Sequence, residues 1–263
     1  MLGAIEGPDT AGGGAVRGAG ERPIVIRCAY CVIPPSSQGA PANGGLQRGV
    51  AYRLRDRMLA ELLPEGENWA LETESWGKPV VRRPQGRDRA AFNLSHTAGM
   101  VACAVGLGCD LGVDVEPIGR DHDHDGLARR FFTRLEADRL ARTPRRARAR
   151  RFISIWTCKE AVTKTLGTGL RMPLDSFSID LTGPRIQWEA SAEASAGWGL
   201  FQRHRKAHVI SLAVRTGACT GPSPQVHWSE ERFASLWDED GTHLGASIRG
   251  PLERSVATPT AEP

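Results

Sequence analysis

Apolar residues along this chain follow two spacings, which predict a mixture of helices and strands. Helical spacing runs over residues 46–63 among good helix formers and ends at Pro64. A second helix is predicted over 150–166, with Gly167 as its C-terminal stop. Alternating or continuous apolar runs predict strands at 24–33, 69–74, 79–82, 101–107, 111–116, 176–181, 186–189 and 207–214.

The order of these elements predicts an α+β fold made of two similar halves. A helix followed by strands occurs over 46–107, and a comparable set occurs over 111–214 without a strict sequence repeat. The composition outside this region turns to Gly, Ala, Pro, Ser and Thr, which is typical of disordered chain. We therefore expect a disordered leader (1–21), an N-terminal half (22–110), a C-terminal half (111–216) and a largely disordered extension (217–263). Within the extension, Trp228–Trp237 is predicted to form one amphipathic helix.

Two short segments carry most of the candidate chemistry. In the predicted strand, Asp114 and Glu116 are two residues apart and share a face. In the predicted helix, Glu160 and Lys164 are four residues apart and share a face. If the two faces meet, three carboxylates gather around one point. They would repel one another without a hard cation, and all-oxygen ligation suits Mg²⁺.

Taken alone, the acidic strand and the Glu–Lys helix are each also typical of an ordinary solvent-exposed surface. Alternating acids on a strand are usually solvated, and a Glu–Lys pair at this spacing supports a helix by only about 0.2–0.5 kcal/mol. Thr133 and Glu136 fit a helix capping box, which we favour over a catalytic role for Glu136.

The order of the motifs resembles that of the Sfp-type 4′-phosphopantetheinyl transferases, from about residue 76 to about residue 180. The motifs that carry the resemblance are Trp76-Gly-Lys-Pro79, Phe92-Asn-Leu-Ser-His96, Gly112-Val-Asp-Val-Glu116, Phe131-Phe-Thr-Arg-Leu-Glu136 and Trp156-Thr-Cys-Lys-Glu-Ala-Val-Thr-Lys164. The resemblance implies two halves related by a pseudo-twofold axis, with the active site at the seam between them.

The implied reaction moves the phosphopantetheine arm of coenzyme A onto a serine of an acyl or peptidyl carrier protein and releases adenosine 3′,5′-bisphosphate. Asp114, Glu116 and Glu160 are then the expected ligands of Mg²⁺, with Mn²⁺ as the alternative ion. Lys164 is expected to contact the pyrophosphate of coenzyme A. Either Glu160 or a metal-bound hydroxide would remove the proton of the acceptor serine.

The resemblance also implies a set of residues that bind coenzyme A. Ser95 and His96 are expected to hold the 3′-phosphate, while Lys78 reaches the nucleotide from a turn. Arg48 is a weaker candidate, because only its position in the first helix matches a basic residue of the family. Family members also commonly carry a basic, aromatic-rich segment before that helix, which helps to bind the 3′-phosphate. Residues 28–47 of this chain contain no Lys or Arg, so Arg48 and Arg53 would have to substitute or coenzyme A would bind less tightly.

The arginine run at 145–151 has two interpretations. It could mark a module that binds nucleic acid, but it lacks interleaved aromatic residues, and the net charge of the chain is only +4. Because carrier proteins are typically acidic, we expect the run to steer carrier docking instead. A Mg²⁺-dependent nucleotide hydrolase or nuclease using the same three carboxylates is the competing enzyme class.

Two other clusters are not expected to bind metal. The Asp-His-Asp-His-Asp run at 121–125 reads as a solvated loop. Cys28 and Cys31 lack a second pair of ligands, so the cysteines read as structural and reduced. With neither a membrane-spanning run nor a secretory signal in the sequence, we expect a cytoplasmic protein. In the family that the chain resembles, the two-halved length favours a monomer that serves secondary-metabolite synthases.

Overall fold

The computed structural model describes residues 24–35, 44–74, 77–85, 87–119, 123–183, 185–188, 196–217 and 223–236. The helices are α1 (Gly44–Leu62), α2 (His124–Phe131), α3 (Arg134–Ala141) and α4 (Arg145–Leu166), with short 3₁₀ turns at Gly169–Arg171, Leu174–Ser176 and Phe233–Ser235. The strands are β1 (Val25–Val32), β2 (Ala70–Thr73), β3 (Pro79–Arg82), β4 (Ala90–Thr97), β5 (Met100–Leu107), β6 (Cys109–Pro117), β7 (Phe177–Asp180), β8 (Arg185–Trp188), β9 (Trp198–Arg205), β10 (His208–Thr216) and β11 (Gln225–Glu231).

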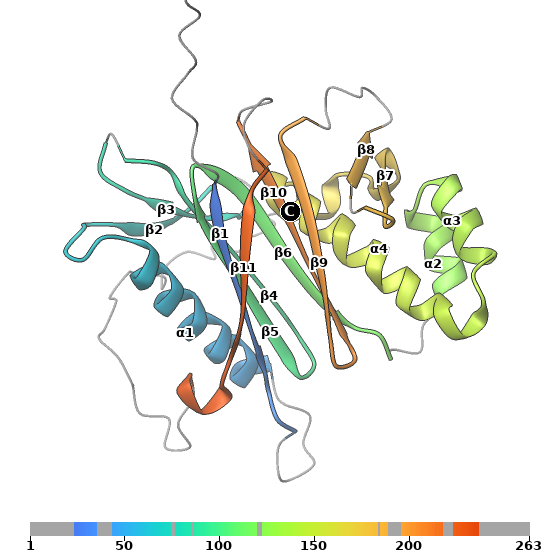
Figure 1. Cartoon of the computed structure of the whole chain (residues 1–263), viewed down its shortest axis with the longest axis horizontal. Helices are drawn as coiled ribbons and strands as arrows, with labels where there is room; N and C mark the ends of the chain where they lie inside the picture. The colour runs from blue at the N-terminus through green and yellow to red at the C-terminus, as the bar shows by residue number, and fades with distance from the viewer. Residues whose placement is uncertain are drawn as a thin grey trace, which may run out of the picture.

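These elements form a mixed α+β structure with four layers (Figure 1). Helix α1 covers one face of a six-stranded sheet with the order β11-β1-β5-β4-β3-β2. The other face of this sheet packs on a three-stranded sheet, β6-β10-β9, and α4 covers the far side of that second sheet. A separate hairpin of β7 and β8 lies beside α4. The seam between the two sheets is therefore formed by the strands that carry the predicted motifs.

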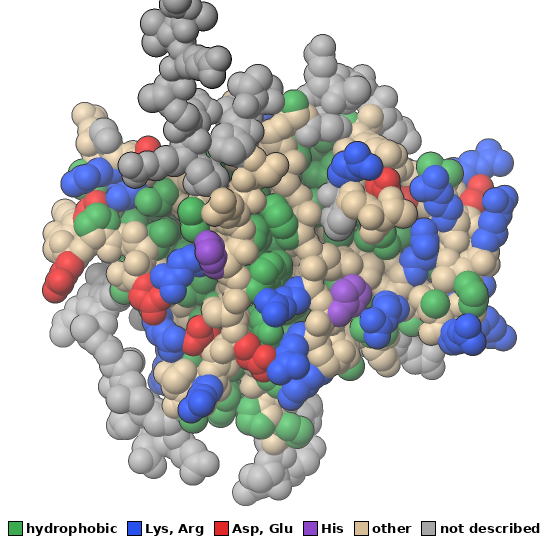
Figure 2. Space-filling view, viewed as in Figure 1, with side chains coloured by type: hydrophobic (Ala, Val, Ile, Leu, Met, Phe, Trp, Pro, Cys, Tyr) green, Lys and Arg blue, Asp and Glu red, His purple; other side chains and the backbone are tan. Residues whose placement is uncertain are grey.

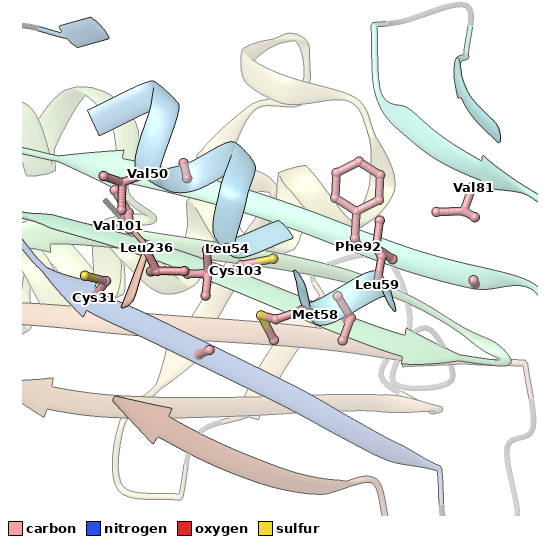
Figure 3. Close-up of a cluster of buried hydrophobic side chains, with 14 of the residues drawn as sticks. Cys31, Val50, Leu54, Met58, Leu59, Val81, Phe92, Val101, Cys103 and Leu236 are labelled. Carbon is pink, nitrogen blue, oxygen red and sulfur yellow. The ribbon is translucent and has the colours of Figure 1, made fainter. Parts of the chain in front are cut away.

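The core beneath α1 shows why this helix forms where the sequence predicts it. Leu54, Met58 and Leu59 point from the helix onto the sheet, where Phe92 and Cys103 are among their neighbours (Figure 3). All of these side chains are buried. Burying one such side chain contributes about 1.5–3 kcal/mol, so the packed face of α1, rather than its intrinsic propensity, stabilises the helix.

The prediction of a helix over Trp228–Trp237 is wrong. The structure describes this segment as far as residue 236 and shows a strand followed by a short turn. Residues 225–231 form β11, which pairs in parallel with β1 from Val25↔Gln225 to Cys31↔Glu231. The pairing covers an edge of the six-stranded sheet that would otherwise present free backbone groups. Its half-buried Val226 and Trp228 pack with the core between the sheets. Only the short turn at Phe233–Ser235 is helical.

The structure also contains strands β4 and β9, which the prediction lacks, and several elements differ from it in extent. Helix α4 begins at Arg145 and not at residue 150, since Pro144 is favourable just before a first turn. Part of the predicted loop at 121–125 is helical: α2 starts at His124, and the side chain of Asp123 caps it by accepting a hydrogen bond from Gly126 N–H. Residues 120–122 lie outside the described residues, as do 1–23 and 237–263.

Two smaller expectations, the capping box and the stop of α4, are confirmed, and two further findings concern the cysteines and the helices. Thr133 and Glu136 form the predicted capping box at the start of α3. Gly167 ends α4 in the left-handed conformation, with a φ of 72°. Cys28 and Cys31 are buried on opposite faces of β1, in different core clusters, so they cannot share a metal ion. Among the described helices, none is both long and apolar enough to cross a membrane.

Candidate active site at the seam between the sheets

Three polar side chains of β4 hold β6 in place. Strand β6 is an edge strand of its sheet, so the N–H groups on its outer side need partners. Asn93 Oδ1 accepts a hydrogen bond from Val113 N–H at 2.9 Å, and Ser95 Oγ accepts one from Val115 N–H at 3.3 Å. Two residues further along β4, Thr97 Oγ1 donates to Glu116 Oε2 at 3.1 Å. The alternate residues of β4 therefore form the polar wall of the seam.

Helix α4 approaches β6 so closely that its backbone touches the strand at Gly112. A Cβ atom built at Gly112 would lie 2.3 Å from the carbonyl oxygen of Ala161 and 2.5 Å from the amide nitrogen of Thr165. Both distances are far below van der Waals contact. Because glycine has no Cβ, it allows this approach and brings Lys164 within reach of Asp114.

The buried carboxylate of Asp114 is the centre of the site. Its side chain is 7% exposed, so Asp114 does not lie on a solvated face. The Oδ1 atom accepts hydrogen bonds from Lys164 Nζ at 2.7 Å and from Ser95 Oγ at 3.0 Å. Lys164 Nζ also donates to Ser95 Oγ at 3.1 Å and to the carbonyl oxygen of Val113 at 3.2 Å. The predicted meeting of the strand face and the helix face therefore occurs through Asp114 and Lys164.

Glu160 lies close enough to both strand acids for their charges to act on it. Desolvation raises the pKa of the Glu160 carboxyl, and the charges of Asp114 and Glu116 raise it further, while Lys164 opposes them. A carboxyl with a raised pKa accepts protons at a higher pH than an ordinary glutamate does, which suits a general base.

The donor set fits a hard cation. Asp114 Oδ2 is buried with no hydrogen-bond partner, and leaving a buried carboxylate oxygen unpartnered is costly. In the part of the chain that is described, no three His, Cys, Asp or Glu side chains already converge as a finished metal cage. The ammonium of Lys164 instead supplies the positive charge beside Asp114. The oxygen atoms of Asp114, Glu116 and Glu160 are the ligand type that Mg²⁺ prefers.

An open pocket of about 570 Å³ lies beside this centre and is lined from both sides of the seam. Lys78, Pro79 and Asn93 contribute from the N-terminal side, and Lys164 and Arg171 contribute from the end of α4 and the turn after it. Its lining is completed by Gly77, Gly167, Thr168 and Gly169. Three cationic side chains around one pocket indicate an anionic ligand.

Lys78 is fixed against the end of α4. Its Nζ donates to the carbonyl oxygen of Thr165 at 2.5 Å, and its methylene groups pack on Gly167. Burial lowers the pKa of Lys78, although the nearby charge of Asp110 opposes this effect. The two halves of the chain are thus joined by a cation at the pocket wall.

His96 and Arg48 lie near enough to each other for their charges to interact, and His96 is on the face of β4 that points away from the seam. The imidazole of His96 is exposed, unlike its neighbours Ser95 and Thr97 on the opposite face of β4. Desolvation lowers the pKa of His96, and the positive charges of Arg48 and Lys164 lower it further. Arg53, the other candidate substitute, donates to the carbonyl oxygen of Leu236 at 2.9 Å and so helps to hold the chain after β11.

The described structure thus joins Asp114 directly to Lys164 and places Glu160 where the charges of Asp114 and Glu116 act on it. Lys78 lines the adjoining pocket, and Arg48 lies near His96. The hydroxyl of Ser95 is occupied by Asp114, Lys164 and Val115 N–H, so its assignment to the 3′-phosphate stays a prediction. Sequence reasoning missed Thr97 and Arg171. The alternation of Asn93, Ser95 and Thr97 along β4 was the available signal for Thr97.

Comparison with known proteins agrees with this geometry. Residues 110–213, which run from β6 through α4 to β10, match the family model of the 4′-phosphopantetheinyl transferase superfamily. This part of the chain is similar to that superfamily. The matched region contains Asp114, Glu116, Glu160 and Lys164, whereas Lys78, Ser95 and His96 precede it.

Individual relatives give the same family. The chain is 33% identical over 129 residues to the 4′-phosphopantetheinyl transferase HetI of a Nostoc species, which covers 49% of this chain and 53% of HetI. It is 36% identical over 112 residues to the 4′-phosphopantetheinyl transferase Sfp of Bacillus subtilis, covering 41% and 46% respectively. A phosphopantetheinyl transferase of a Thraustochytrium species is 28% identical over 216 residues, or 75% of this chain and 74% of its own. The match thus spans about half the length of the first two relatives.

Among solved structures, a holo-(acyl-carrier-protein) synthase from Bacillus anthracis in complex with CoA (3′,5′-ADP) aligns with a TM-score of 0.36 and 20% identity. The alignment covers 41% of this chain and 96% of that one.

Proposed function

We propose that this protein transfers the phosphopantetheine arm of coenzyme A to a serine of an acyl or peptidyl carrier protein. The observation that carries the proposal is the buried, unpartnered Oδ2 of Asp114, whose other oxygen is bound by Lys164, a residue that also lines a cationic pocket. A carboxylate oxygen is thereby available to a cation, and positive side chains are available to polyphosphate. The superfamily match and the printed names of the relatives support the same activity.

Asp114, Glu116 and Glu160 would hold the metal ion, with Mg²⁺ as the expected ion and Mn²⁺ as the alternative. When bound, such an ion acts as a Lewis acid and neutralises the charge that develops on the pyrophosphate. The chain itself supplies the ligands on two rigid elements, β6 and α4, whose separation is fixed by the contact at Gly112. Rigid placement of this kind is a precondition for in-line transfer.

Lys164 has two roles in this proposal. In the free protein its ammonium neutralises Asp114, and this contact keeps α4 and β6 together. Lys164 also lines the pocket, where its ammonium would bind a phosphate oxygen of the substrate. Its pairing with Asp114 would be exchanged for a pairing with the substrate.

The proton of the acceptor serine needs a base, and Glu160 is our preferred candidate. Its pKa is raised by burial and by the neighbouring acids, so it can take up a proton at a pH where an ordinary glutamate would not. The nucleophile itself comes from the carrier, and Glu160 holds the proton that leaves it.

The remaining cations would bind the nucleotide part of coenzyme A. Lys78 and Arg171 line the pocket, while Arg48 lies near His96, which is on the face of β4 that points away from the seam. An anion near His96 would offset the charges of its neighbours and favour the protonated imidazole. Ser95 would join this set only if it released Asp114.

The proposal also covers the domain organisation, the location and the partners of the protein. The two halves, 22–110 and 111–216, would be related by a pseudo-twofold axis, and the protein would act as a cytoplasmic monomer on carriers of secondary-metabolite synthases. The arginine run at 145–151 would attract the acidic carrier surface.

Release of adenosine 3′,5′-bisphosphate tests the proposed reaction. The full chain is incubated with coenzyme A and Mg²⁺, with and without an apo carrier protein, and the nucleotide product is measured by chromatography. We expect release only when an apo carrier is present, and none from a carrier whose acceptor serine is replaced by alanine. Release that is equally fast without carrier would favour the nucleotide hydrolase and contradict the transferase.

A further inference from the structure

A second cationic pocket lies outside the seam, between α3, α4 and the β7–β8 hairpin. It has a volume of about 730 Å³ and is lined by Arg139, Arg142 and Arg151. Figure 2 shows Lys and Arg side chains gathered over the end of the molecule formed by α2, α3 and the start of α4. Arg151 and Lys164 are separated by thirteen residues of α4, or about 20 Å along the helix axis. The pocket is therefore distinct from the proposed active site.

The three arginines are not used by the protein itself. Within the ranges that the structure describes, none of their guanidinium groups makes an ion pair or a hydrogen bond, and Arg151 Nε is buried without a partner. The neighbouring Arg148 shows the contrast. It pairs with Asp125 at 2.6 Å and donates to the carbonyl oxygens of Ala141 and Thr143. Arg148 thus fixes the turn that frames the pocket, and the other three arginines face it with free donors.

The acids at the pocket do not cancel this charge. Glu136 is bound by Lys159 at 2.9 Å and by the capping box of α3, so its charge is already neutralised. Asp180 Oδ1 accepts hydrogen bonds from Thr182, and these lower the pKa of Asp180, with smaller effects of Arg185 and Arg139. The pocket lining therefore contains three guanidinium groups and only one carboxylate whose charge is not already neutralised, so its net charge is positive.

The rest of the lining favours a phosphate group with an organic body. The N-terminus of the 22-residue α4 opens at Pro144 without a side-chain cap, so the positive end of the helix adds to the arginines. Ile155, Ile179 and Leu181 form an apolar floor. Guanidinium groups bind phosphate oxygens through paired N–H donors, and a tetrahedral oxyanion can accept from several of them at once. From these features we infer that the pocket binds a phosphate ion or a small phosphate monoester, at a site separate from that of coenzyme A.

The test uses the full chain and inorganic phosphate as the probe. Binding is measured by isothermal titration calorimetry, with and without saturating adenosine 3′,5′-bisphosphate, against sodium chloride at equal ionic strength. The test variant is Arg139→Gln/Arg142→Gln/Arg151→Gln. The matched control is Arg145→Gln/Arg146→Gln, which removes two exposed arginines outside the pocket.

We expect saturable phosphate binding in the wild type that persists with the bisphosphate present. The triple variant should bind at least ~10-fold more weakly, because it loses charged hydrogen bonds, while the control variant keeps wild-type affinity. Equal affinity in the triple variant and the wild type would overturn the inference. So would an equal loss in the control, which would mean diffuse charge attraction. If phosphate fails to bind but an acidic carrier loses affinity for the triple variant, the pocket serves protein carboxylates and our assignment is wrong. Each result is independent of whether the transferase reaction occurs.

Discussion

Replacing Gly112 by alanine should separate α4 from β6 and disable the proposed site. The added Cβ would stand 2.3 Å from Ala161 O and 2.5 Å from Thr165 N, and both atoms belong to backbone that cannot rotate away. Restoring van der Waals contact requires a shift of α4 by about 1 Å. Overpacking of this kind typically costs ~1–3 kcal/mol, and the rigidity of the two elements argues for the upper end.

The same shift would lengthen the 2.7 Å contact between Lys164 and Asp114 and move Glu160 away from the strand acids. A misplacement of about 1 Å can lower a reaction rate by ~100-fold. We therefore expect the Gly112→Ala variant to remain folded, to unfold at lower urea concentration, and to transfer phosphopantetheine far more slowly than its stability loss explains.

Urea unfolding and initial rates of carrier modification measure both effects. Gly119→Ala is the matched control, because a Cβ at Gly119 meets nothing within 4 Å. The reasoning is refuted if Gly112→Ala and Gly119→Ala match the wild type in both stability and rate.

Three further perturbations follow from the described contacts. Lys159→Met should lower the free energy of unfolding by ~3–5 kcal/mol, because it leaves the carboxylate of Glu136 buried and unpaired. Adding Glu136→Gln should restore part of this free energy. Urea unfolding measures both variants, and a double variant no more stable than Lys159→Met would contradict the prediction. Ser95→Ala should lower the free energy of unfolding by ~1–3 kcal/mol, because the N–H group of Val115 loses its acceptor. An unchanged midpoint of urea unfolding would contradict a stabilising role of the hydrogen bond between Ser95 and Val115. For His96, burial and two neighbouring cations lower its pKa, so the folded chain binds this proton at lower pH than the unfolded chain and loses stability as the pH falls from about 6.5. Nuclear magnetic resonance titration should find this pKa below that of a free histidine and higher after adenosine 3′,5′-bisphosphate binds; a pKa that does not move would remove His96 from the nucleotide site.

The centre of the site could be predicted from the sequence because its geometry is local. Asp114 and Glu116 share a face by the two-residue period of a strand, and Glu160 and Lys164 share one by the helical period. Spacing alone does not show that the strand face and the helix face meet; the order of the motifs, through the family resemblance, predicts that they do. The structure then adds what local spacing does not contain: the contact at Gly112 that sets the distance between the elements.

The parts that failed depend on contacts between distant segments. The half-buried Val226 and Trp228 of β11 are two residues apart, which is the period of a strand, and the pairing of this segment with the distant β1 fixes the strand. The predicted role of the arginine run in steering the carrier stays a prediction, but the structure shows that its arginines have different surroundings. Arg148 holds the turn before α4, and Arg151 turns toward the second pocket.

The mass of an apo carrier protein after incubation with coenzyme A, Mg²⁺ and this protein tests the central claim most directly. We predict a gain equal to one phosphopantetheine arm on the acceptor serine, abolished by EDTA and by Glu160→Gln, but retained in Glu61→Gln, which removes an exposed glutamate of α1. A carrier panel that gains no mass, or a gain that survives both EDTA and Glu160→Gln, would contradict the proposed transferase site.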